Sequence, residues 1–233
     1  MKTTIHRSEA RGYIDHGWLK THHSFSFGQW YDPDLMGVGA LRVINEDIIA
    51  PQRGFATHPH KDMEILTYVI SGTLTHQDSM GNQTHITAGE WQLMRAGTGI
   101  RHSEVNQGPE AVHLFQIWIQ PDQLNLQPHY QQIRLDAKET PNQWQQIAAN
   151  DQQAPMHIHQ QVRIETAYLQ QQQQLALPLT GQKGYLHVID GEVIVNQQRL
   201  SQGDAIQIDQ ATAILAQTHS HLLYFDLAIA QPE

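Results

Sequence analysis

Short stretches in which apolar and polar residues alternate recur along the first half of the chain, separated by turns rich in glycine and asparagine. Successive side chains of a β-strand point to opposite faces, so this alternation predicts strands and not helices. The predicted strands cover residues 24–27, 41–45, 47–50, 64–70, 72–76, 84–87, 91–95 and 112–119. Many short strands at regular spacing, joined by polar turns, indicate an all-β barrel or sandwich.

The composition changes between Pro121 and Ala154, where glutamine, proline and asparagine dominate and one short helix is predicted at residues 142–149. Sections rich in proline and polar residues commonly separate packed domains. We therefore place the domain boundary in this segment. It predicts one barrel over residues 1–140 and a second barrel over residues 141–233.

The layout of the first half repeats in a weaker form after the boundary. Strands are predicted at residues 162–169, 184–189, 192–195 and 203–208. Asp190-Gly191 suits a primed turn and predicts a hairpin between its flanking strands. The tract Gln170–Gln174 predicts an exposed loop or strand end. The second half is therefore expected to be a degenerate barrel without metal.

Charge and composition exclude several classes of protein. The chain has 14 lysines and arginines against 23 acidic residues, a formal charge of −9, which argues against a nucleic-acid partner. There is no cysteine, so disulfides and thiolate metal ligands are excluded, and a cytoplasmic location is expected. No apolar run approaches eighteen residues and the N-terminus lacks a signal pattern, so no membrane association is predicted.

Two pairs of metal-ligating residues stand out. His58 and His60 are two apart on a predicted strand, so they share a face and lie roughly 6–7 Å apart along the backbone. Pro59 between them indicates a strand edge or a bulge. His102 and Glu104 repeat the spacing on a second predicted strand. If the strands are adjacent and antiparallel, three nitrogens and one carboxylate surround a single cation.

Other histidine pairs provide an internal comparison. A lone His-x-His pair is more often structural than metal-binding. The pairs His157/His159 and His219/His221 have no downstream His-x-Glu partner with flanking glycines, and we expect neither to bind a metal. His22 and His23 are expected to be ordinary surface residues, with a place at the mouth of a pocket as the alternative.

The motifs resemble the two-part cupin signature. A first block runs from Gly54 to Gly72 and a second from Gly89 to Asn106, although Arg95 replaces the usual proline. His102 comes two residues later than in most cupins, and this later histidine resembles the pirin branch of the superfamily. The resemblance is strong over residues 12–121, and the matching segments include His16-Gly-Trp, His23-Ser-Phe-Ser-Phe and Ala96-Gly-Thr-Gly-Ile-Arg-His-Ser-Glu.

The resemblance implies a bicupin with one divalent metal in the N-terminal barrel, held by His58, His60, His102 and Glu104. In this branch Glu64 is expected to orient a histidine and not to bind the ion. Nitrogen and oxygen ligands with open positions suit Fe(II), the expected metal, and also Mn, Ni, Co or Cu. One carboxylate leaves the shell with a charge of about +1, which favours an anionic oxygen ligand.

The implied activity is that of the bacterial pirin-like quercetin 2,3-dioxygenases. These open the central ring of a flavonol such as quercetin with O2 and release carbon monoxide, and Glu104 would accept the flavonol proton. The expected partners are therefore a small aromatic substrate and O2, with the protein a monomer. Two other hypotheses stay open: a metal- or redox-responsive regulator acting through a protein partner, and a cupin isomerase or binding module without oxygen chemistry.

Overall fold

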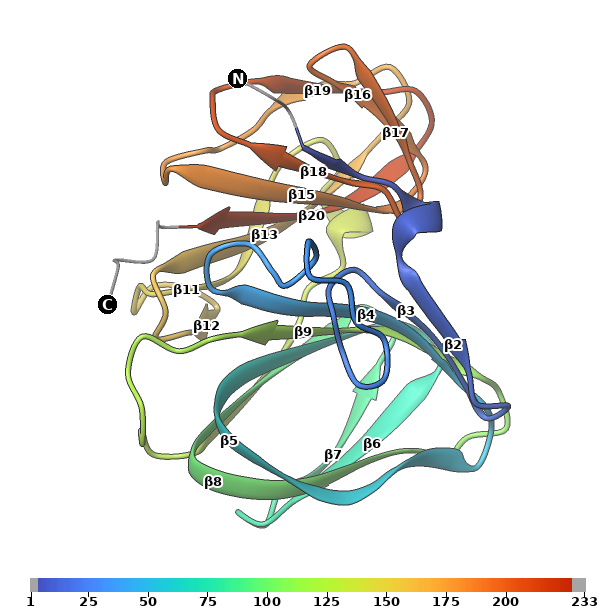
Figure 1. The fold of residues 1–233 in the computed structure, drawn as a ribbon, viewed down its shortest axis with the longest axis vertical. Helices are drawn as coiled ribbons and strands as arrows, with labels where there is room; N and C mark the ends of the chain where they lie inside the picture. The colour runs from blue at the N-terminus through green and yellow to red at the C-terminus, as the bar shows by residue number, and fades with distance from the viewer. Residues whose placement is uncertain (1–3, 228–233) are drawn as a thin grey trace. The chain divides into compact units, whose positions relative to one another are not determined.

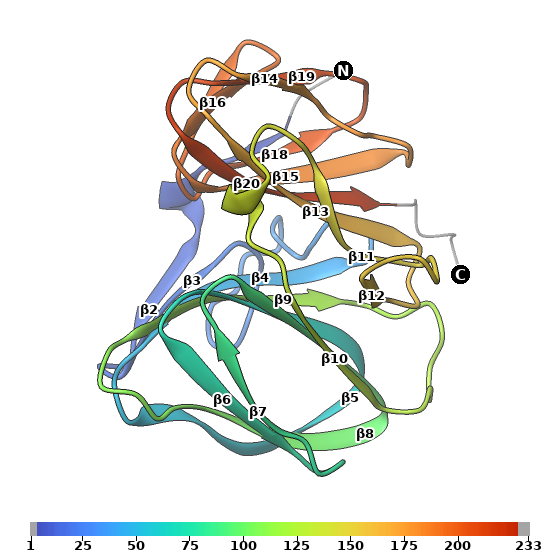
Figure 2. The same ribbon diagram turned by 180° about the vertical axis from the view of Figure 1, so that it is seen from behind.

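The computed structural model of the chain describes residues 4–227, and β-strands make up nearly all of its regular structure (Figures 1 and 2). Its helical segments are two short 3₁₀ turns, η1 (Ser8–Ala10) and η2 (Ala137–Glu139). The described residues contain no α-helix, which confirms the all-β prediction. They also contain no helix long and apolar enough to cross a membrane.

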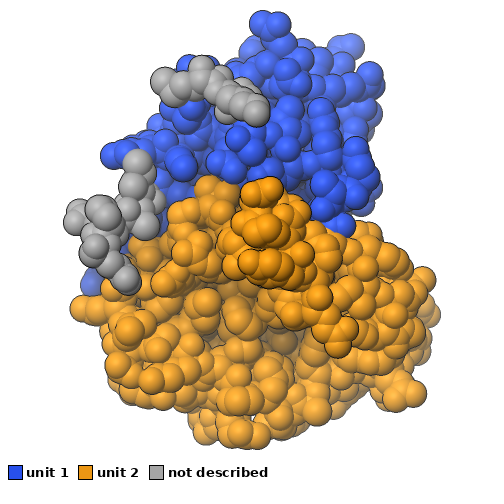
Figure 3. All heavy atoms as spheres, in the orientation of Figure 1, with its two compact units in different colours: residues 1–11, 136–157, 161–233 blue, residues 12–135, 158–160 orange. Residues whose placement is uncertain are grey.

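The chain divides into two compact units (Figure 3). Unit 2 comprises Gly12–Leu135 together with Ile158–Gln160. Unit 1 comprises Met1–Arg11, Asp136–His157 and Gln161–Glu233. Its described residues are 4–11, 136–157 and 161–227.

Unit 2 is built on one nine-stranded antiparallel sheet with the order β2-β3-β4-β9-β5-β8-β6-β7, and β10 pairs with β8. Its strands are β2 (Gly12–Asp15), β3 (Leu19–His23), β4 (Leu41–Ile49), β5 (Arg53–Ser71), β6 (Thr73–Asp78), β7 (Gln83–Thr87), β8 (Glu90–Asn106), β9 (Val112–Ile119) and β10 (His129–Arg134). Figure 1 shows the two long strands, β5 and β8, curving together around one end of this unit. Because β5 and β8 bend, the sheet encloses an interior.

Two apolar clusters of described residues contribute to the core of unit 2. One gathers Leu19, Ile49, Val69, Leu74, Ile86, Val112 and Leu114, and the other gathers Ile65, Met94, Ala96 and Ile100. Strand β5 contributes to both clusters, so it ties them together. The ring of Tyr68 on β5 stacks on that of Trp91 on β8 at 4.1 Å between centroids. Burial of these side chains is the main force that holds the long pair of strands together.

Unit 1 contains a seven-stranded sheet with the order β1-β18-β15-β20-β13-β11-β12 and a four-stranded sheet with the order β14-β19-β16-β17. Its strands are β1 (Ile5–His6), β11 (Gln145–Ala149), β12 (Met156–His157), β13 (Val162–Leu169), β14 (Gln174–Ala176), β15 (Lys183–Asp190), β16 (Glu192–Val195), β17 (Gln198–Ser201), β18 (Ala205–Ile208), β19 (Ala213–Ala216) and β20 (Ser220–Leu227). Leucines, valines and isoleucines of both sheets form one buried cluster.

Two predictions in the second half are wrong. Residues 145–149 form β11 and not a helix, because the strand pairs with β13 and with β12 and buries Ile147. Tertiary pairing here overrides local helix propensity. The predicted hairpin at Asp190-Gly191 is also absent: β15 pairs with β18 and β20, whereas β16 pairs with β17 and β19. The turn therefore passes the chain from one sheet to the other.

Two predictions in the first half are also wrong. Residues 24–27 leave the sheet after β3, although Phe25 is fully buried. Residues 41–49 form one continuous strand, β4, with no turn at Asn45–Asp47. Asn45 and Asp47 are two residues apart, so they share a face of this strand, and both are buried. By contrast, the predictions for 112–119 and 162–169 are confirmed by β9 and β13, and Gln170–Gln174 is exposed as expected.

The side chain of Asn106, at the end of β8, donates hydrogen bonds to three backbone carbonyl groups. Its Nδ2 donates hydrogen bonds to the carbonyl oxygens of Ile49 at 3.1 Å, Ala50 at 3.2 Å and Glu110 at 2.7 Å. Its Oδ1 accepts one from the backbone N–H of Gly108 at 3.0 Å. The residue is fully buried, so these bonds replace water completely.

We expect Asn106→Asp to lower the free energy of unfolding by about 3 kcal/mol or more, because it aims a carboxylate at three carbonyl oxygens inside the protein. Urea denaturation of both proteins measures the change. Asn150→Asp, at an exposed position, is the control and should stay within about 0.5 kcal/mol of the wild type. Equal stability of the Asn106 and Asn150 variants would contradict this account.

Candidate metal centre

The pairing of β5 with β8 places the four predicted ligands. The strands run antiparallel, with His58 opposite His102 and Phe55 opposite Glu104. Register shifts on β5 on both sides of this segment adjust where its side chains point. A Cβ atom on Gly54 would lie 2.2 Å from the backbone oxygen of Glu104. Only glycine therefore lets β5 approach β8 this closely beside the carboxylate.

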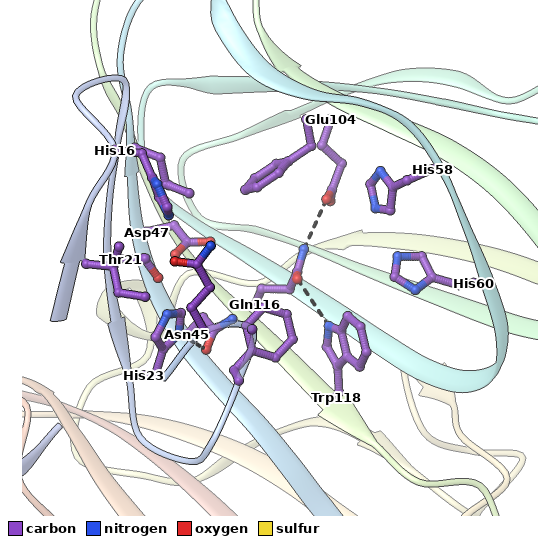
Figure 4. Close-up of a pocket in the computed structure, with 16 residues that line it drawn as sticks. His16, Thr21, His23, Asn45, Asp47, His58, His60, Glu104, Gln116 and Trp118 are labelled. Carbon is purple, nitrogen blue, oxygen red and sulfur yellow. Dashed lines mark hydrogen bonds between the residues drawn. The ribbon is translucent and has the colours of Figure 1, made fainter. Parts of the chain in front are cut away.

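Three imidazole rings converge at this point (Figure 4 shows His58 and His60). The ring centroids of His58, His60 and His102 lie 4.4–4.9 Å apart, and one ring nitrogen from each lies within 4.8 Å of the others. The structure therefore brings together the three histidines that the spacing predicted. They form a histidine-rich candidate metal site.

The nitrogen positions fit a shared cation. The Nδ1 atom of His58 is 2.8 Å from the carbonyl oxygen of Ala56 and donates to it, so its Nε2 carries a lone pair. That Nε2 is 3.0 Å from the Nε2 of His102. Two nitrogens each about 2.1 Å from one ion at a right angle lie about 3.0 Å apart, as in octahedral coordination, whereas tetrahedral angles need about 3.4 Å.

A directed chain of hydrogen bonds holds the Glu104 carboxylate, which is buried. Its Oε2 accepts a bond from Gln116 Nε2 at 3.0 Å, and its Oε1 accepts a longer one from Thr67 Oγ1 at 3.4 Å. Trp118 Nε1 donates to Gln116 Oε1 at 3.1 Å, which orients the Gln116 amide toward the carboxylate (Figure 4). Because indole N–H can only donate, the direction of the chain is determined.

His76 is a neighbour of this site that the sequence reasoning missed. It lies on β6 opposite Glu104, is fully buried, and its ring centroid is 5.3 Å from that of His102. Its Nε2 is 3.0 Å from Oδ2 of Asp78. One acceptor or nitrogen atom from each of His76, His102 and Glu104 also lies within 4.8 Å of the others. The only sequence signal was its place at the end of a predicted strand, two residues before an acidic residue.

Burial and mutual repulsion favour the uncharged state of His60 and His102. Burial, with the neighbouring His102 and His58, lowers the pKa of His60 to about 4. Burial, with His58 and His76, lowers the pKa of His102 to about 3. Burial raises the pKa of the Glu104 carboxyl, and the surrounding imidazoles oppose that rise. Neutral imidazoles with free lone pairs are the form that binds a metal.

The site opens into a pocket of about 430 Å³ that lies wholly within unit 2. His58, His60 and Glu104 line one side of it, and Trp118 and Phe55 are among its apolar walls. The volume suits a small aromatic molecule.

Two residues behave differently from expectation. Glu64 does not orient a histidine ring through its described hydrogen bonds: its carboxylate accepts from the backbone N–H groups of His159 at 2.8 Å and Gln160 at 3.1 Å. It therefore anchors the 158–160 segment to unit 2. His23, expected at the surface, is buried and lines the pocket.

The chain is similar to known proteins over almost all of its length. It matches the family descriptions Pirin over residues 4–119 and Quercetinase C-terminal cupin domain over residues 146–227, which confirms the two-cupin prediction. A protein named quercetin 2,3-dioxygenase from Escherichia coli (strain K12) is 43% identical over 227 residues, covering 96% of this chain and 97% of that one. A pirin-like protein from Caulobacter vibrioides is 40% identical over 222 residues, covering 93% and 96%. The crystal structure of the bacterial pirin YhhW from Escherichia coli in complex with nickel(II) matches with a TM-score of 0.93 at 40% identity, covering 98% of this chain and 100% of that one.

The lowered pKa values of His60 and His102 predict how the stability of the metal-free protein depends on pH. Between about pH 6.5 and pH 4 the unfolded chain binds protons that the folded imidazoles do not, so the free energy of unfolding falls as the pH falls. Glu104 opposes this trend because its folded-state pKa is raised. The variant His60→Asn/His102→Asn removes the contribution of these two imidazoles, and it also removes the lowering effect of His60 on the pKa of Glu104, which acts in the same direction.

Urea denaturation in the presence of a chelator, at several pH values from 7 to 4, measures the effect. The wild type should lose more stability over this range than the double variant does. Parallel curves for the two proteins would show that the imidazoles are not held neutral in the folded state.

Proposed function

This chain belongs to the pirin family, and from that premise we propose that it is a metal-dependent dioxygenase that opens the central ring of flavonols such as quercetin. The reaction consumes O2 and releases carbon monoxide. The observation that carries the proposal is the convergence of three imidazoles beside a pocket that His58, His60 and the oriented Glu104 carboxylate line. The name of the E. coli relative supports the same substrate class.

We assign His58, His60, His102 and Glu104 as the ligands of one divalent ion per chain, with Fe(II) as the native metal. The 3.0 Å separation of the Nε2 atoms of His58 and His102 is short enough for both to bind one ion. Nickel(II) in the E. coli pirin supports a site for borderline metals. When bound, the metal would supply the Lewis-acidic and redox chemistry that the reaction with O2 needs.

Glu104 accepts the proton of the flavonol 3-hydroxyl in this proposal. Burial raises the proton affinity of its carboxyl, which makes it a stronger base than an exposed glutamate. The hydrogen bond from Gln116, itself oriented by Trp118, holds the accepting oxygens in position. The apolar side chains of the pocket exclude water from the anionic flavonol that results.

We further propose that the protein acts as a cytoplasmic monomer and that residues 141–233 bind no metal. The absence of cysteine supports a reducing compartment. Light scattering coupled to size exclusion should give the mass of one chain. A mass of two or more chains at micromolar concentration would overturn the monomer.

The direct test loads purified protein separately with Fe(II), Mn, Ni, Co or Cu and follows quercetin loss, O2 uptake and carbon monoxide release. At least one metal form should couple all three. If none consumes O2 with any flavonol, the dioxygenase proposal fails. The alternative, a regulator acting through a protein partner, would then be tested by affinity capture with the metal-loaded chain as bait.

Metal content should identify the ligands. His58→Ala and His102→Ala are expected to lose most of the metal, because each removes a donor from a small shell. His157→Ala and His219→Ala, from the histidine pairs outside unit 2's site, should keep one metal per chain. Elemental analysis measures both. Full metal retention in the His58 and His102 variants would contradict the assignment of these residues as ligands.

The ligand and base roles of Glu104 should separate in Glu104→Gln. The amide retains one oxygen donor but loses the charge and the basicity, so the variant should keep much of its metal yet lose about 10²–10⁴-fold in rate. Part of the loss should return at higher pH, where the flavonol ionises unaided. Glu64→Gln is the control, since the Glu64 carboxylate bonds backbone N–H groups and not the ring nitrogens, and it should leave turnover nearly intact. A metal-loaded Glu104→Gln protein with wild-type turnover would remove Glu104 as the base.

A further inference from the structure

The pocket has a second polar side, formed by Thr21, His23, Asn45 and Asp47, which we call the polar wall. All four side chains belong to buried residues, with 3–4% of the residue surface exposed. Figure 4 shows them grouped across the pocket from His58 and His60, with Gln116 between the two groups. Burying four polar residues is costly unless they meet a polar partner.

Strand register builds the polar wall. Thr21 and His23 on β3 lie opposite Asp47 and Asn45 on β4, and Asn45 in turn lies opposite Gln116 on β9. Residues two apart on a strand share a face, so the four side chains line the same side of the interior. The polar wall is therefore continuous with the residue that holds Glu104.

The chemistry of the polar wall favours hydrogen-bond donors on a ligand. The Nδ1 of His23 lies 2.7 Å from the Oδ1 of Asn45 and donates to it, so these two side chains orient one another. Asp47 adds a carboxylate, which accepts hydrogen bonds and repels anions. The Thr21 hydroxyl is buried and has no hydrogen-bond partner among the described residues. A neutral hydroxyl group can donate to the buried Oδ1 of Asp47 or pair with the Thr21 hydroxyl, whereas the Asp47 carboxylate repels a phosphate or a carboxylate.

Apolar side chains also line the pocket, namely those of Ile14, Leu19, Phe27, Phe55 and Trp118. This arrangement suits a flat aromatic body with polar groups at two separate places. A polyhydroxylated flavonol has this pattern, with one oxygen group at the central ring and phenolic hydroxyls on the outer rings.

We propose that the polar wall is a specificity subsite that recognises phenolic hydroxyls remote from the oxygen held near the imidazoles, with Asp47 as their main acceptor. This inference rests on the proposed function, since it assigns the two ends of the same substrate. It predicts that the enzyme selects among flavonols by their outer-ring hydroxylation. Asp47 thus determines specificity and takes no part in the proton transfer assigned to Glu104.

The test compares quercetin, which carries outer-ring hydroxyls, with 3-hydroxyflavone, which has none. Asp47→Asn should lower kcat/KM for quercetin by about tenfold to hundredfold, chiefly through KM, because a hydrogen bond to a charged group is lost. The value for 3-hydroxyflavone should stay close to that of the wild type. Thr21→Val, which keeps the shape of the side chain, should also lower the ratio of kcat/KM for quercetin to kcat/KM for 3-hydroxyflavone. This second variant tests the proposal if Asp47→Asn fails to fold.

Glu46→Gln is the matched control. It changes the neighbouring carboxylate on the same strand, which pairs with His113 at 3.0 Å and does not line the pocket. It should leave the ratio of kcat/KM values for the two flavonols unchanged. An equal loss for both flavonols in Asp47→Asn and Thr21→Val, or the same ratio change in Glu46→Gln, would overturn the subsite.

Binding measurements separate this inference from the proposed function. Titration of the nickel-loaded proteins with both flavonols, without O2, gives dissociation constants that do not depend on turnover. If the wild type never turns over a flavonol but Asp47→Asn still weakens quercetin binding selectively, the dioxygenase proposal fails and the subsite stands. If the wild type binds both flavonols equally, or neither, the subsite is overturned whatever the turnover.

Discussion

The antiparallel register of β5 against β8 is the constraint on which the site depends. Side chains alternate with a period of two along a strand, so a slip of one residue would turn His58 and His60 out of the interior. The stacked pair Tyr68 and Trp91 and the apolar cluster around Ile65 lock the register at one end of the two strands. At the other end, Gly54 permits the close approach beside Glu104. Apolar packing along these strands thus fixes the positions of the polar side chains in the site.

The interior of unit 2 contains many buried polar side chains. Imidazoles, carboxylates and amides lie in a row from β3 to β8, and each must be bonded or must face a ligand. A directed chain of hydrogen bonds meets this requirement for Trp118, Gln116 and Glu104. Burial and mutual repulsion keep His60 and His102 neutral, so these two rings add no unpaired positive charge to the interior. A bound cation would supply the charge that this arrangement of lone pairs attracts.

The proposed selectivity of the pocket rests on the contrast between its two polar sides. One side offers lone pairs that converge within a few ångströms, a geometry for a metal ion. The other side spreads acceptors over two strands, a geometry for separate hydroxyl groups. The apolar side chains that also line the pocket would pack against the flat aromatic body of the proposed substrate.

The amino-acid sequence by itself determined the all-β class, the family and the three converging histidines, because period-two alternation and same-face spacing are local properties of a strand. It could not separate a turn from a strand at Asn45–Asp47, since polar residues occur in both and only the enclosed pocket gives them an inward role. Likewise, His76 looked like an ordinary strand residue until β6 paired with β8 opposite Glu104. The polar Glu64 resembled a partner of the site, but its buried carboxylate meets backbone groups almost a hundred residues away. Contacts between distant segments decide which polar residues face the pocket, and these contacts exist only once the sheet has closed.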